Sequence, residues 1–242
     1  MEILIVALDD ELLCYNMVNN EVFIYLTTKV PLGARCSMLE TPLDSIKRLG
    51  DVIMKYGKLS HIKEGCEVAR LLPDGEPLFI YLIKGQVRYE LSKDYWLSSL
   101  KPPVVLGVID YFYPNERVGR FISETDSIGY TVPASKIVNL LSEKNLWSDI
   151  AIFLSYVTKR LMEREMLLSS SNAYAIVCHY LNILNEESSE IKNKISALHY
   201  LRRHTKLSKS MISLIISELK KGGYITIDKG YLQSIKFLPG NF

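Results

Sequence analysis

The order of the segments in the last third of the chain is the feature that most constrains the fold. Apolar residues recur there at helical spacing, a double glycine breaks the pattern, and alternating residues follow. In order, the segments are a helix over 173–185, a short helix through Ile195, Leu198 and Leu201, a turn over 202–206, a helix over 209–220 with Ser208 as N-cap, Gly222–Gly223, and strands over 224–227 and 231–237. This order predicts a winged helix-turn-helix.

Such a domain is suited to double-stranded DNA. The second helix of the pair fits the major groove, and the residues near its N-terminus face base edges. Basic residues around it meet phosphates, which set position but not sequence. The predicted DNA-binding residues are Lys209, Ser210 and Ser213 for the bases, beside the Ser208 cap, and Arg202, Arg203, Lys206 and Lys229 for the phosphates. A helical hairpin that docks a protein partner is the alternative.

The charge distribution favours the DNA interpretation. Residues 172–242 hold ten Lys and Arg against five Asp and Glu, a net charge of +5. Because the whole chain carries +2, the remainder carries −3. A basic domain on a mildly acidic body favours a phosphate-backbone partner, although a chance asymmetry of a solvated surface would look the same.

The middle of the chain predicts a barrel of antiparallel strands. From about Asp51 to Thr131, short strand-like runs alternate with turns such as Pro73–Pro77, and no helix is expected between them. The strongest runs cover 78–83, 86–91, 104–107, 118–122 and 127–132. Strands at this spacing predict a jelly roll preceded by a helix that starts at Leu43. Residues 1–42 form an extension of uncertain structure.

Two helices are expected between the barrel and the winged helix. One begins at Pro133, and a longer one covers 146–168 with a continuous apolar stripe. The stripe packs either on the barrel or on the same helix of a second subunit, and we expect the dimer because a barrel alone rarely needs so long a helix. The predicted dimerisation residues are Ile150, Phe153, Leu154, Val157 and Leu161.

Cysteine usage and hydropathy indicate the cellular compartment in which the protein is expected. None of Cys14, Cys36, Cys66 and Cys178 stands in a CxxC pair or has a histidine at metal-ligand spacing, so free thiols in a reducing compartment are expected. Cys66, next to Gly65, is the candidate if one thiol senses oxidants. The apolar start has no basic flank, and no stretch reaches membrane-span length. A cytoplasmic location is expected.

The order barrel, long helix, winged helix resembles the Crp–Fnr superfamily of bacterial transcription regulators over roughly residues 43–238. Residues 194–238 are most similar to the winged helix of the IprA-like branch, and 207–215 match the turn and recognition helix. The resemblance places Lys209 at the first base-reading basic position. Ser210 stands where a glutamate is common and Leu214 where an arginine is common, so the target sequence does not carry over.

The effector site departs from the family pattern as well. Cyclic-nucleotide members carry a Gly-Glu…Arg-Ser/Thr cassette, where this chain has 106–110, Leu-Gly-Val-Ile-Asp, without the downstream pair. The N-terminal cysteine cluster of iron–sulfur members is absent, and His61 and Cys66 lack the pattern of a haem site. We therefore expect no cofactor and no metal, and the effector is unknown.

These inferences combine into an α+β protein with four regions. They are an extension over 1–42, a jelly-roll sensor-like domain over 43–133, connecting helices over 134–170 that include the dimerisation helix, and a winged helix-turn-helix over 171–242. The expected function is sequence-specific DNA binding by a homodimeric, non-enzymatic transcription regulator without membrane contact. A cupin-type metal enzyme is the remaining alternative; it needs two or three histidines and a carboxylate, and the barrel offers only His61.

Overall fold

The computed structural model describes the backbone of residues 3–8, 11–18, 21–26, 40–113, 118–170 and 172–239, with side chains from residue 40 onward. Contacts divide the chain into two units, 1–39 and 40–242. In the described part of the first unit, β1 (Ile3–Leu8), β2 (Glu11–Val18) and β3 (Glu21–Leu26) pair as an antiparallel meander. The remainder of the predicted extension up to residue 39, including Cys36, lies outside the described residues.

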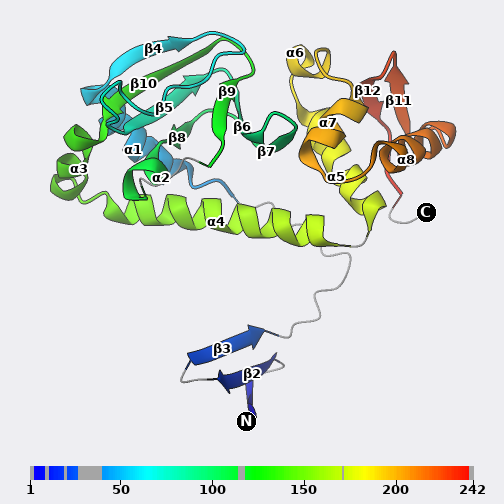
Figure 1. Ribbon diagram of the computed structural model, residues 1–242, viewed down its shortest axis with the longest axis horizontal. Coiled ribbons are helices and arrows are strands. Elements are labelled where there is room, and N and C mark those ends of the chain that lie inside the picture. The colour runs from blue at the N-terminus through cyan, green and yellow to red at the C-terminus, as the bar shows by residue number, and fades with distance from the viewer. Residues whose placement is uncertain are drawn as a thin grey trace. The chain divides into compact units, whose positions relative to one another are not determined.

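Two antiparallel sheets form the barrel of the second unit (Figure 1). The first has the order β4-β10-β5-β8 and consists of β4 (Lys58–Ile62), β10 (Ser127–Pro133), β5 (Leu78–Lys84) and β8 (Val104–Leu106). The second has the order β7-β6-β9 and consists of β7 (Tyr95–Leu100), β6 (Val87–Ser92) and β9 (Arg120–Ser123). The predicted antiparallel architecture is confirmed, and β7 is a strand that the sequence pattern did not predict.

Strand β5 explains how the barrel is joined to its helices. Its side chains alternate between two cores, so that Ile80 and Leu82 face the interior of the barrel while Phe79 faces the helices. Every residue from Leu78 to Leu82 is buried. An unbroken apolar run is therefore required here, because both faces of the strand are covered.

Four helices accompany the barrel. They are α1 (Leu43–Tyr56), α2 (Val108–Phe112), α3 (Ala134–Glu143) and α4 (Trp147–Ser169). The expectation that strands begin near Asp51 is wrong, because Val52 and Ile53 continue the buried stripe of α1 for another turn. The short helix α2 was not predicted either, and it begins directly after Gly107, whose φ of +88° suits glycine. No helix in the described residues is long and apolar enough to cross a membrane.

The long helix α4 runs beside the barrel towards the last domain (Figure 1). Ile150 and Phe153, two of the predicted dimerisation residues, are buried in the core that α1, α3 and β5 share. Leu154 and Val157 are partly buried against the same core, whereas Leu161 is 43% exposed. The first half of the apolar stripe is thus covered within the chain, since it packs on the helical side of the barrel.

Candidate nucleic-acid interface

The last domain has the element order expected of a winged helix-turn-helix. Its elements are α5 (Ala173–Glu186), α6 (Ser189–Lys192), α7 (Ala197–His204), α8 (Lys209–Lys221), β11 (Ile225–Asp228) and β12 (Tyr231–Ile235). A single core joins α5, α7, α8, β11 and β12, and its fully buried members include Leu181, Leu201 and Leu219. This core fixes the orientation of α8 relative to α7 and the wing.

The first helix of the pair lies further along the chain than its apolar spacing indicated. Helix α7 starts at Ala197 because the Ser196 side chain accepts a hydrogen bond from the backbone N–H of His199. It continues through His204, so that Arg202 and Arg203 stand in its last turn rather than in the connection. The connection consists of residues 205–208.

Helix α8 is capped as the sequence indicated. The Ser208 hydroxyl accepts a hydrogen bond from the Met211 backbone N–H at 3.2 Å. Ser208, Lys209, Ser210 and Ser213 are all exposed on the first turns of the helix. The structure therefore brings the three predicted base-reading residues and the Ser208 cap together on one accessible end of α8.

Replacing the cap residue tests this local geometry. We expect Ser208→Ala to lower the free energy of unfolding by about 1 kcal/mol, because the Met211 N–H loses its acceptor. Urea denaturation measures the change. Ser208→Asp, which keeps an acceptor, should retain the stability, and Ser213→Ala serves as a serine-to-alanine control inside the same helix. A Ser208→Ala chain as stable as the wild type would contradict the assigned cap.

The wing presents one further predicted contact. β11 and β12 pair antiparallel, and Lys229 and Gly230 at their turn have φ values of +47° and +91°. Two positive φ angles match the right-handed twist of a hairpin. The exposed Lys229 therefore lies at the tip of the wing, as the sequence predicted.

The predicted phosphate contacts do not share one environment. Arg202 and Lys206 are exposed, as Lys229 is. Arg203, in contrast, donates hydrogen bonds to the Lys93 carbonyl and to the Asp94 carboxylate in the β6–β7 hairpin, and its Nε also donates to His199 at 3.0 Å. Arg203 therefore binds the barrel in this structure. Sequence spacing does not indicate this contact.

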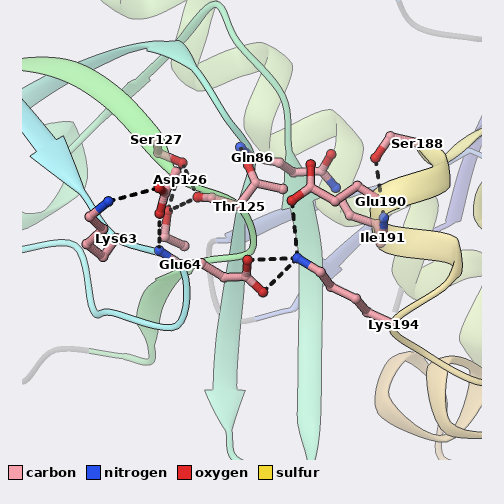
Figure 2. A network of polar contacts seen from close by, with 11 residues as sticks. Lys63, Glu64, Gln86, Thr125, Asp126, Ser127, Ser188, Glu190, Ile191 and Lys194 are labelled. Atoms are coloured by element: carbon pink, nitrogen blue, oxygen red, sulfur yellow. Dashed lines mark hydrogen bonds and ion pairs between the residues drawn. The ribbon is translucent and has the colours of Figure 1, made fainter.

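Polar contacts join the winged helix to the barrel elsewhere too. Figure 2 shows Lys194 between Glu64 of the barrel, at 2.7 Å, and Glu190 of its own domain, at 3.1 Å. Both partners are about half exposed, so this pair contributes little stability. The ion pair between Lys194 and Glu64 nevertheless shows where the winged-helix domain contacts the barrel.

A more buried contact lies beside it. The Gln86 amide donates to Glu124 at 3.0 Å and to Glu187 of the winged-helix domain at 3.1 Å. Lys101 adds an ion pair with Glu187 at 3.0 Å. Burial raises the pKa of Glu124 despite the hydrogen bonds that it accepts.

An aromatic cluster completes the junction. His204 is 2% exposed; its ring stacks on Tyr180 at a centroid distance of 5.1 Å and meets the edge of Trp96 in β7 at 5.7 Å. Neither ring nitrogen of His204 has a hydrogen-bond partner within the described part of the chain. Burial, and then the charge of Arg164, lowers the pKa of His204 to about 3.

Comparison with known proteins defines the class of the domain. Residues 173–240 match the family model for winged helix-turn-helix DNA binding. The predicted winged helix-turn-helix fold over this part of the chain is therefore confirmed.

Solved structures extend the likeness to the barrel. The c-di-GMP responsive global regulator CLP of Xanthomonas campestris aligns with a TM-score of 0.59 and 14% identity, over 79% of this chain and 100% of that protein. A CRP/FNR family transcriptional regulator from Thermus thermophilus aligns with a TM-score of 0.57 and 17% identity, over 74% and 94%. The chain has the fold of Crp–Fnr regulators, as its resemblance implied.

Curated relatives are similar over almost their whole length. The inhibitor of hydrogen peroxide resistance from Escherichia coli K12 is 24% identical over 202 residues, 83% of this chain and 97% of the relative. Its counterpart from Salmonella typhimurium LT2 is 23% identical over 204 residues, 84% and 99%. These proteins are the relatives that the IprA-like resemblance anticipated.

Proposed function

We propose that this protein is a homodimeric transcription regulator that binds specific sites in double-stranded DNA and catalyses no reaction. The observation that carries the proposal is the capped end of α8, where Lys209 and three serines are exposed within a winged helix-turn-helix. A helix presented in this way fits the major groove, and lysines beside it neutralise phosphates. The Crp–Fnr fold of the chain supports the same role.

The second half of α4 supports a dimer. Leu161, Met162 and Met166 are 43%, 61% and 62% exposed. Exposed apolar side chains grouped along one helix are suited to pairing with the same helix of a second copy. Of the residues predicted from sequence, Leu161 belongs to this proposed dimer surface, whereas Ile150 and Phe153 are covered by their own chain.

Selection from a random duplex DNA library at low salt tests both parts of the proposal. We expect an enriched site made of two inverted half-sites about 10 base pairs apart, because two symmetry-related recognition helices meet the same face of the duplex. Sedimentation velocity should give a dimer. Changing Leu161 and Met162 together to glutamate should produce a monomer that binds this site weakly.

The controls separate the alternatives. Leu59→Glu places a single glutamate at a 52% exposed leucine of the barrel and should leave both assembly and binding unchanged. A selection without any enriched duplex would overturn DNA binding and favour a protein partner for the winged helix. Enrichment of a single, unrepeated half-site by a monomer would overturn the dimer alone.

A further inference from the structure

The outward face of α8 has an unusual composition for a DNA-reading helix. The buried side consists of Ile212, Ile215 and Leu219. Opposite to it, at helical spacing, lie the exposed residues Ser210, Ser213, Leu214 and Ser217. Leu214 is 60% exposed and stands among the three serines. The sequence of α8 contains no arginine, although lysines stand at both ends of the helix.

This composition limits what the helix can recognise. Guanine is most often read by a bidentate arginine or lysine, and none of the four residues of this face is either of these. A leucine cannot exchange hydrogen bonds with a base edge. The thymine 5-methyl group is the apolar feature of the major groove, so Leu214 can gain from contact with thymine.

The serines of this face are compatible with DNA binding but do not themselves select a particular base sequence. Each hydroxyl can both donate and accept a hydrogen bond, so Ser210, Ser213 and Ser217 tolerate several base edges. DNA is the occupant that the surroundings favour, because the exposed Arg202, Lys206 and Lys229 belong to the same domain and would meet phosphates. A leucine in the middle then supplies the discrimination that the serines lack.

We propose that Leu214 reads thymine methyl groups in the major groove, so that the protein selects half-sites rich in T·A pairs. This inference rests on the proposed DNA-binding function and adds the base that is read and the residue that reads it.

Replacing thymine by deoxyuridine removes the methyl group and changes no hydrogen-bonding group. We would take the best duplex of the library selection and exchange its thymines one at a time. At one or two positions per half-site, we expect the exchange to weaken binding roughly 4-fold, the effect of one buried methyl group. The remaining positions should show no change, which fluorescence anisotropy titration can resolve.

Protein variants assign the effect to the side chain. Leu214→Ala should bind the thymine and deoxyuridine duplexes with nearly equal affinity, because the side chain proposed to contact the methyl group is removed. Leu59→Ala, at an exposed leucine of the barrel, should keep the full difference. Since Leu214 is exposed, its truncation leaves the core of the domain intact, and circular dichroism confirms folding.

The outcomes separate the two proposals. If no duplex is enriched, the DNA-binding function itself is wrong. If duplexes bind but the deoxyuridine exchange has no effect at any position, or if Leu214→Ala retains the difference, the reading of thymine by Leu214 is overturned while DNA binding stands.

Discussion

Raising the salt concentration from about 50 to about 200 mM is expected to weaken DNA binding by roughly 10³-fold. Each protomer presents exposed basic side chains for phosphates at Arg202, Lys206 and Lys229. A dimer would therefore neutralise about six phosphates, and each contact releases condensed counterions, a release that added salt makes less favourable. The expected slope of log affinity against log salt is about −5.

Variants show whether these lysines are the source. Lys229→Ala should make the slope less steep by about 2, because a dimer loses two phosphate contacts. Lys136→Ala removes an exposed lysine from α3, beside the barrel, and should leave the slope unchanged. Anisotropy titrations at four or so salt concentrations measure the slope; a value near zero would contradict a phosphate-contacting surface.

Lowering the pH from 7 to 4.5 is expected to reduce the free energy of unfolding by about 2–3 kcal/mol through His204 alone. The folded chain keeps this histidine neutral because burial lowers its pKa to about 3. The unfolded chain takes up a proton below its ordinary pKa of about 6.5. Protons therefore favour the unfolded state between these two values, at about 1.4 kcal/mol for each pH unit.

Comparison with His204→Phe isolates this contribution, because phenylalanine keeps a flat ring among Tyr180, Tyr200 and Trp96 without a titrating group. The variant should lose about 2–3 kcal/mol less than the wild type over the same pH interval in urea unfolding. Glu124 acts in the opposite direction, since a raised pKa lets the folded chain bind its proton first, and its effect cancels between the two chains.

An exposed histidine provides the control. His61→Gln should follow the wild-type pH dependence, because His61 is exposed on β4 and is not one of the aromatic residues packed around His204. Equal pH dependence of wild type and His204→Phe would show that His204 is not held neutral in the folded protein.

Short sequence patterns predicted those helices and strands whose formation depends on residues close together in the sequence. Ser208 followed by an apolar stripe and a double glycine predicted α8 almost to the residue, because caps and turns act over a few positions. The apolar run over 78–83 predicted a buried strand for a similar reason, and residues 78–82 are buried. Strand β7 was not predicted, because its residues other than Trp96 are all only partly buried and show no clear alternation of buried and exposed positions.

Packing decided what composition left open. The apolar stripe of α4 fits a barrel or a second subunit equally well by its spacing, and only the positions of Ile150 and Phe153 in the core tell which part of it is buried within the chain. Likewise, nothing local distinguishes Arg203 from Arg202, since both are basic residues in one helical turn. Asp94, more than a hundred residues earlier, accepts a hydrogen bond from Arg203 and not from Arg202.

The sequence by itself determined the winged helix-turn-helix, the antiparallel barrel and the positions of the exposed serines and lysines, because each follows from capping, periodicity and turn chemistry within short windows. Only the tertiary structure decided that Arg203 faces the barrel, that His204 is buried without a hydrogen-bond partner among the described residues, and that Leu214 stands exposed among serines. These properties depend on which distant side chains come into contact, and a one-dimensional pattern does not contain that information.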